Sequence, residues 1–234
     1  MSYGANEEES RTAATYRKLR RLVVEGRLAP GRRLSETELA GKLRVSRTPV
    51  RSALQRLEQE GYVETTGHGL RSGAVVVPLT KKDAKELFYM LGAVEGLAAR
   101  ECAELSEEKR RPVVEELRRI NRELAKLGKE ERPDMTVWLG LDTEFHGTYV
   151  EAAGGPRLQK FHNSIRPQAE RYARMYVATH RHEINTSVGE HRAIISAIES
   201  GQPDWAEEAV ENNWRSAANR LRRDIDEMGE RGGW

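Results

Sequence analysis

The amino-acid sequence predicts a mostly α-helical protein with two parts: a small N-terminal unit of three helices and a β-hairpin, and an all-α bundle of six helices. Apolar residues recur at helical spacing along most of the 234 residues, and strand-like runs occur only between residues 62 and 77. The sequence PLTKKD indicates a linker at residues 79–82, so we expect domains at residues 11–78 and 83–230.

The composition excludes several classes of protein. No apolar run approaches the roughly eighteen residues that span a bilayer, and the acidic start MSYGANEEES does not resemble a signal peptide. We therefore expect a cytoplasmic protein with no membrane partner. The single cysteine, Cys102, excludes a disulfide within the chain.

The charge is unevenly distributed along the chain. Residues 1–79 carry 14 Lys and Arg against 9 Asp and Glu, whereas residues 80–234 carry 25 against 28. A basic N-terminal part favours a polyanionic partner such as nucleic acid. A solvated basic surface without a partner would give the same count.

The N-terminal unit is expected to begin with a helix over residues 11–26, after a polar leader at residues 1–10 that we expect to be disordered. Ser35 then opens a second, short helix that ends near Leu43. The Ser35 hydroxyl can cap this helix by accepting a hydrogen bond from the backbone of Glu38, whose side chain reaches back in a capping box.

The third helix follows Ser46, a good N-cap residue, and tolerates Pro49 in its first turn. Its inward stripe is apolar and consists of Val50, Ala53, Leu54 and Leu57. Its opposite face carries hydroxyl, amide and guanidinium groups, from Arg47, Thr48, Arg51, Ser52 and Gln55, with no acid before Glu58. Such donors bind base edges and phosphates, and a helix, short turn and helix can place them in a major groove.

Two strand-like runs, YVETT and AVVV, flank the glycine-rich sequence GHGLRSG. They predict a β-hairpin with His68 and Arg71 at its tip. Such a hairpin forms a wing that can lie on the phosphate backbone or enter the minor groove.

The stretch EGRLAPGRRLSETELAGKLRVSRTPVRSALQRLEQEGYVETTGHG resembles the winged helix-turn-helix of the GntR family of bacterial transcription regulators. The resemblance implies that Arg47 and Arg51 contact operator DNA. It also implies further contacts from Ser46, Thr48, His68 and Gly69. Thr37 departs from the pattern, because some members carry a DNA-contacting arginine at this position.

The rest of the chain has a helical period throughout. The predicted helices lie near residues 81–102, 107–127, 133–153, 156–179, 185–200 and 203–228.

Polar side chains interrupt the apolar faces of three of these helices. Asp142 and His146 are four residues apart and share one face, His191 begins an isoleucine stripe, and Asn213 lies within an alanine and leucine stripe. Buried polar groups need partners, and a divalent metal would satisfy several of them at once. The alternative is a hydrogen-bonded core without a metal, and no special role is expected for His162, His180 and His182.

The sequences DTEFH, EHRAIISAIESG and AEEAVENNW resemble the FCD-type effector domain of the FadR branch of the GntR family, and the six helices resemble its VanR subgroup. Metal-binding members use one aspartate and three histidines. The resemblance implies the ligands Asp142, His146 and His191, with Asn213 in place of the last histidine, and these donors suit zinc or nickel. Leu91, four residues before Glu95, also departs from the family, which often has an arginine there.

The resemblance implies a homodimeric, ligand-responsive transcription regulator, a repressor that binds a palindromic operator in double-stranded DNA. A small organic acid would complete the metal coordination, with Arg166, Arg171 or Arg174 facing it. Two alternatives stay open: a metal-dependent hydrolase built on the bundle, and a regulator whose metal is only structural. Because spacing places no further acid or base near the candidate ligands, we expect no enzyme activity.

Overall fold

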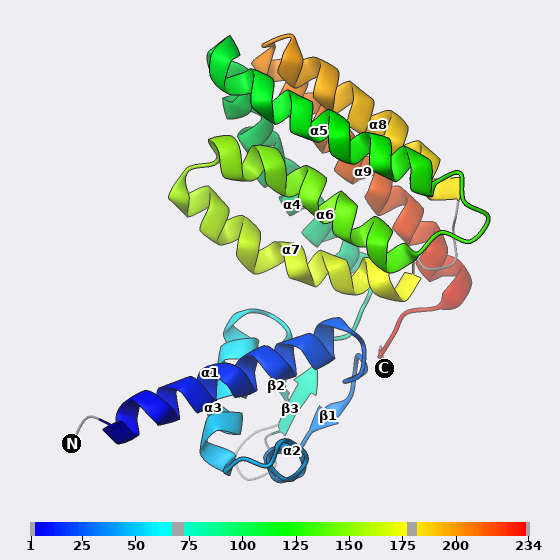
Figure 1. Cartoon of the computed structure of the whole chain (residues 1–234). Helices are drawn as coiled ribbons and strands as arrows, with labels where there is room; N and C mark the ends of the chain where they lie inside the picture. The colour runs from blue at the N-terminus through cyan, green and yellow to red at the C-terminus, as the bar shows by residue number, and fades with distance from the viewer. Residues whose placement is uncertain (1–2, 67–72, 177–181, 233–234) are drawn as a thin grey trace. The chain divides into compact units, whose positions relative to one another are not determined.

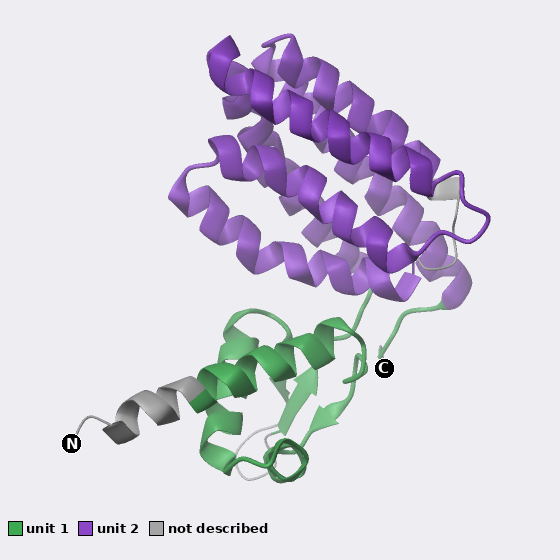
Figure 2. Ribbon diagram, viewed as in Figure 1, with its two compact units in different colours: residues 1–80, 229–234 green, residues 81–228 purple. Residues whose placement is uncertain are grey.

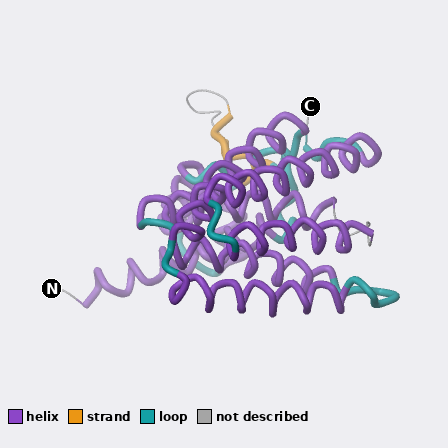
Figure 3. Tube along the Cα trace, turned by 90° about the horizontal axis from the view of Figure 1, so that it is seen from above, coloured by secondary structure: helices purple, strands orange, loops and turns teal. Residues whose placement is uncertain are grey.

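The computed structural model describes residues 3–66, 73–176 and 182–232. The chain forms two compact units, the first made of residues 1–80 and 229–234 and the second of residues 81–228 (Figure 2). Most of the described trace is helical, and its strands all belong to unit 1 (Figure 3). The predicted mostly α-helical fold is thereby confirmed.

The described residues of unit 1 form three helices and a small sheet, labelled in Figure 1. Its elements are α1 (Tyr3–Val24), β1 (Arg33–Leu34), α2 (Glu36–Leu43), α3 (Arg47–Gln59), β2 (Val63–Thr66) and β3 (Gly73–Val76). The sheet is antiparallel with the order β1-β3-β2. The hairpin of β2 and β3 was predicted, whereas β1, only two residues long, was missed because so short a strand has no periodicity to detect.

The core of unit 1 is built on the predicted inward stripe of α3. Val50 and Leu57 are fully buried and belong to one apolar cluster with Leu19 of α1, Tyr62 and Val76. Burial of a side chain such as Leu57 contributes about 1.5–3 kcal/mol. This packing fixes the rotation of α3, so its opposite face is exposed.

Helix α1 begins at Tyr3, eight residues before the expected start at Arg11. The expected disorder of the leader at residues 1–10 stays a prediction.

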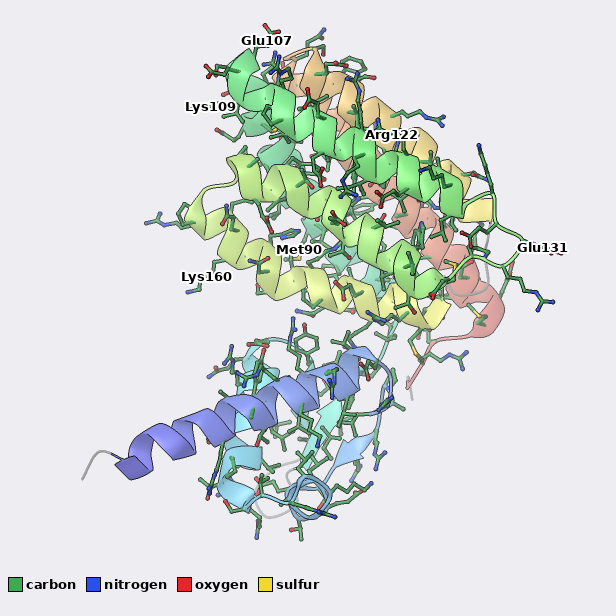
Figure 4. All side chains as sticks on the ribbon, in the orientation of Figure 1. Met90, Glu107, Lys109, Arg122, Glu131 and Lys160 are labelled. Atoms are coloured by element: carbon green, nitrogen blue, oxygen red, sulfur yellow. The ribbon has the colours of Figure 1, made fainter. Side chains whose placement is uncertain are left out.

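Within residues 81–176 and 182–228, which the structure describes, unit 2 forms six helices, and the six predicted helices are confirmed. They are α4 (Lys81–Glu104), α5 (Glu107–Leu127), α6 (Met135–Ala153), α7 (Pro156–Tyr176), α8 (His182–Glu199) and α9 (Pro203–Met228). The expected end of α7 at Thr179 lies outside the described residues. Side chains fill the space between these helices, whereas the labelled Lys160 lies at the exposed surface of α7 (Figure 4). Within the described residues, the helices all lack the long apolar stretch that a bilayer span requires.

Helices α4 and α9 pack closely along their length. Gly92 permits this approach, because a Cβ atom there would lie 3.1 Å from the Cβ of Trp214, tighter than an ordinary contact. The close packing brings the Trp214 ring beside Glu95, one turn further along α4.

Candidate functional site

The exposed face of α3 carries the residues predicted to contact DNA. Ser46, Arg47, Thr48 and Arg51 are all exposed, as are Ser52 and Gln55. Ser46 is the N-cap of α3, but its side chain makes no capping hydrogen bond. His68 and Gly69, the predicted wing contacts, lie outside the described residues.

This face also contains a carboxylate that the sequence pattern did not predict. The carboxylate of Glu36, at the start of α2, accepts hydrogen bonds from both Arg47 and Arg51. The periodicity of α3 concerns this helix alone, in which no acid precedes Glu58, so it gives no sign of a carboxylate that a neighbouring helix supplies.

The second candidate site lies inside unit 2, where α6 and α8 bring three predicted ligands together. One donor atom from each of Asp142, His146 and His191 can be chosen so that all three lie within 4.8 Å of one another. Oδ1 of Asp142 is 3.9 Å from Nε2 of His146 and 3.7 Å from Nε2 of His191. Both histidines are buried. Three donors of the types preferred by late transition metals therefore face one point.

Glu95 of α4 orients His146. It is fully buried, and its Oε2 lies 2.6 Å from Nδ1 of His146. Burial raises the pKa of Glu95, but the charge and hydrogen bond of His146, followed by His162 and Arg166, hold the pKa well below its ordinary value. An ionised carboxylate only accepts hydrogen bonds, so Nδ1 of His146 must donate. In the neutral ring the lone pair is then on Nε2, which faces Asp142.

Three further donors surround the Glu95 carboxylate. Oε2 accepts from Nε1 of Trp214 at 2.7 Å and from the hydroxyl of Tyr149 at 3.1 Å, and Oε1 accepts from Nε2 of His162 at 2.8 Å. His162 is thus a hydrogen-bonded core residue outside the group of candidate metal ligands. His162 follows no motif in the sequence, and only the packing of α7 against α4 brings it to Glu95.

His191 has no hydrogen-bond partner within the described part of the chain. Both of its ring nitrogens are buried and unpaired, and its ring stacks on Phe145 at a centroid distance of 3.8 Å. Burial is the largest cause that lowers the pKa of His191, to about 3, and the nearby carboxylate of Asp142 offsets only part of this fall. His191 is thus a neutral imidazole, the form that binds metals.

Asn213, the predicted fourth ligand, has its side-chain amide held in a defined orientation. Its Nδ2 donates to Oε2 of Glu190 at 2.9 Å, and Glu190 is fixed by two hydrogen bonds from Arg220. Because the nitrogen is committed to Glu190, the group that Asn213 can offer to a cation is its carbonyl oxygen. This oxygen is a weaker ligand than an imidazole nitrogen for zinc or nickel.

A cavity of about 70 Å³ adjoins these residues. Its lining combines aromatic and aliphatic side chains with Asp142, His146, Arg166, Glu170, Ser187, Asn213 and Arg220. A volume of this size exceeds what a single water needs. The cavity can therefore hold a few waters or a small anionic group beside the candidate ligands.

Among the three predicted effector-binding arginines, Arg166 lines the cavity. Its Nη2 donates to Oδ2 of Asp142 at 2.9 Å, while its Nε and Nη1 are buried and have no hydrogen-bond partner within the described residues. Arg171 is buried away from the cavity lining, and Arg174 is exposed. Nη1 lies 3.7 Å from Oε1 of Glu95, an ion pair without a hydrogen bond, so Nε and Nη1 both keep hydrogen-bond donors for an incoming carboxylate.

The residues present fit a divalent transition metal. Oδ1 of Asp142 and Nε2 of His146 face Nε2 of His191, and the unpaired nitrogens of His191 leave a buried polar group that a cation would satisfy. Leu91, at the position where the family often has an arginine, is buried in the core. His180 lies outside the described residues, as does the side chain of His182.

Two family models match the chain. The family described as "Bacterial regulatory proteins, gntR family" matches residues 11–71, and the FCD domain matches residues 86–216. Both are families of transcription regulators, which confirms the expectation of a non-enzyme. The family descriptions name no subgroup, so the VanR-like grouping stays a prediction.

Curated relatives include regulators from several bacteria. An HTH-type transcriptional regulator in an unstable DNA locus of Streptomyces ambofaciens is 32% identical and aligns over 89% of this chain and 84% of that protein. A probable D-xylose utilization operon transcriptional repressor of Paenarthrobacter nicotinovorans is 30% identical over 80% of this chain and 78% of that protein.

Solved structures share the fold. A GntR regulator from Rhodococcus sp. RHA1 has a TM-score of 0.67 and 24% identity, covering 91% of this chain and 97% of that one. E. coli McbR/YncC has a TM-score of 0.69 and 18% identity, covering 92% of this chain and 98% of that one. At this identity the likeness establishes the fold alone.

Proposed function

This chain belongs to the GntR family of bacterial transcription regulators and carries an FCD domain, and from that premise we propose that it is a homodimeric repressor released from its operator by a small organic acid. The acid binds in the cavity of unit 2, next to a divalent metal. The observation that carries this proposal is the convergence of Asp142, His146 and His191 beside a cavity lined by Arg166.

Different residues of this site would hold the metal and orient its ligands. Asp142, His146 and His191 would hold the metal, with Asn213 as a weaker fourth ligand, and the metal would act as a Lewis acid that binds a carboxylate. Glu95 keeps the proton on Nδ1 of His146, which leaves Nε2 available.

Arg166 would bind the anion directly. Its Nη2 is paired with Asp142, and its Nε and Nη1 provide donors for a carboxylate oxygen. The aromatic side chains Phe88, Trp138 and Trp214 supply the apolar part of the lining. This combination favours a small acid with an apolar body.

A panel of small mono- and dicarboxylates tests the proposal. Each acid would be added to the zinc-loaded protein and to protein treated with EDTA, with melting temperature and operator affinity as readouts. We expect at least one acid to raise the melting temperature and to weaken operator binding by about fivefold to a hundredfold. A metal that stabilises unit 2 while every acid leaves operator affinity unchanged would instead support a purely structural metal.

The dimer interface is proposed to lie on α4 and α7. An exposed apolar stripe runs along α4 through Tyr89, Met90, Ala93 and Leu97, and α7, which packs against α4, exposes Phe161. Met90 is labelled in Figure 4. Exposed apolar stripes of this kind mark interaction surfaces, and two copies of one stripe can meet around a twofold axis.

Substitution of Leu97 by aspartate should convert the dimer to a monomer. A carboxylate buried in an apolar interface has no partner, so we expect the dimer dissociation constant to rise about thirtyfold or more. Light scattering coupled to size-exclusion chromatography measures the mass. Val137→Asp, on α6 and 49% exposed, is the control that should remain dimeric. A Leu97→Asp protein that stays dimeric would place the interface elsewhere.

Substitution of Arg51 by alanine should weaken operator binding by about tenfold to a hundredfold, because a side chain that pairs with a guanine would be lost. Fluorescence anisotropy with a labelled duplex, selected by the wild-type protein from a random library, measures the change. Arg17→Ala, an exposed arginine of α1 that is absent from the α3 face, removes the same charge and should have a small effect. Equal losses in the two variants would contradict the assigned role.

A further inference from the structure

Glu36 forms hydrogen-bonded ion pairs with the two arginines that are proposed to contact DNA. Nε and Nη2 of Arg51 donate to its two carboxylate oxygens at 2.8 and 2.9 Å, a two-pronged ion pair, and Nη2 of Arg47 donates to the second oxygen at 3.1 Å. The arginine side chains are 57% and 60% exposed, whereas Glu36 is 26% exposed. The carboxylate thus lies beneath the guanidinium groups and holds them from the protein side.

The ion pair with Glu36 leaves several N–H donors of the Arg51 guanidinium available for another partner. A guanidinium has five N–H donors, and Glu36 engages Nε–H and one of the two hydrogens on Nη2. The other Nη2 hydrogen and both Nη1 hydrogens remain for a partner at the other edges of the guanidinium. Two parallel donors are what bidentate recognition of guanine O6 and N7 requires.

The same carboxylate partly neutralises the positive charge of this face. Phosphate contacts depend on charge and carry no sequence information, whereas base contacts depend on the position of the donors. A carboxylate beneath the arginines therefore weakens attraction to any phosphate more than it weakens a well-placed pair with guanine.

We propose that Glu36 is a specificity-determining positioning residue: it presents Arg51 to a guanine edge and reduces binding to non-operator DNA. This inference rests on the proposed DNA contacts of Arg47 and Arg51. Hydrogen bonds from Arg51, then Arg47, lower the pKa of Glu36, so the carboxylate is charged at neutral pH.

Glu38 provides a matched control within the same helical turn. Both glutamates lie in the first turn of α2 and carry the same charge, but Glu38 pairs with Lys42 at 2.6 Å and Arg32 at 2.9 Å instead of the α3 arginines. An effect of charge alone should therefore change DNA binding equally in Glu36→Gln and Glu38→Gln. Loss of the ion pairs with Arg47 and Arg51 should change DNA binding only in Glu36→Gln.

The experiment compares the wild type, Glu36→Gln and Glu38→Gln on two duplexes of equal length: one selected by the wild type from a random library, and one with its sequence shuffled. Dissociation constants are measured by anisotropy over a series of KCl concentrations. For Glu36→Gln we expect binding to the shuffled duplex to tighten about tenfold, the ratio of the two affinities to fall about tenfold, and the salt dependence to steepen. Glu38→Gln should leave the ratio unchanged.

Glu36→Asp separates position from charge. It keeps the carboxylate but shortens its reach, so the affinity ratio should fall while affinity for the shuffled duplex rises little. Equal ratios in the wild type and Glu36→Gln, or equal falls in Glu36→Gln and Glu38→Gln, would overturn this inference while leaving the DNA contacts intact. A wild-type protein that does not discriminate between the duplexes would overturn the proposed function itself, and this inference with it.

Discussion

Replacement of Glu95 by alanine is expected to destabilise unit 2 by about 3–5 kcal/mol, because it removes the common acceptor of several buried donors. His146, His162, Tyr149 and Trp214 all donate to this carboxylate, and Arg166 lies 3.7 Å from it. Without Glu95 these groups keep their desolvation cost and lose their partner. The variant also opens a small cavity at the contact of α4 with α9.

Chemical denaturation followed by circular dichroism measures this effect, and a loss of this size corresponds to a fall in melting temperature of about 10 °C. Glu101→Ala removes an exposed glutamate from the same helix and should change stability by less than about 0.5 kcal/mol. Glu95→Gln keeps one acceptor oxygen and should lie between the two. A Glu95→Ala protein as stable as Glu101→Ala would show that the donors find other partners.

The sequence predicted the elements whose pattern is local. The stripe of Val50 and Leu57 fixed the exposed face of α3, and the four-residue spacing of Asp142 and His146 placed both on one face of α6. Periodicity records which side of a helix is apolar, and this information needs no knowledge of the neighbouring helices.

The sequence could not predict the groups whose role depends on another helix. Glu95 lies in α4 among apolar residues, and its buried charge is explained only by donors from α6, α7 and α9. Glu36 likewise reaches Arg51 on the exposed face of α3 only because α2 packs on α3. Charged residues separated by many positions show no periodicity, so such pairs appear only once the helices are assembled.

The metal site gives the second large expected effect. The wild type should bind zinc or nickel with one equivalent per chain, and His191→Ala should weaken that binding by at least about a hundredfold, since the loss of a group that merely orients a ligand already costs tenfold to a hundredfold. His191 has no other hydrogen-bond partner within the described residues, so its nitrogens are available to the metal. Isothermal titration calorimetry and elemental analysis of the purified protein measure both quantities.

Two further variants separate loss of a ligand from loss of packing. Phe145→Leu removes the ring that stacks on His191 but removes no metal ligand, so it should lower stability while leaving the zinc affinity within about tenfold of the wild type.

Asn213→His replaces the weak amide ligand with an imidazole and should tighten zinc binding by about tenfold or more. If Asn213→His binds zinc no better than the wild type, Asn213 does not face the metal. If His191→Ala binds zinc as tightly as the wild type, Asp142, His146 and His191 do not form a metal site, and the convergence of their donor atoms is explained by packing alone.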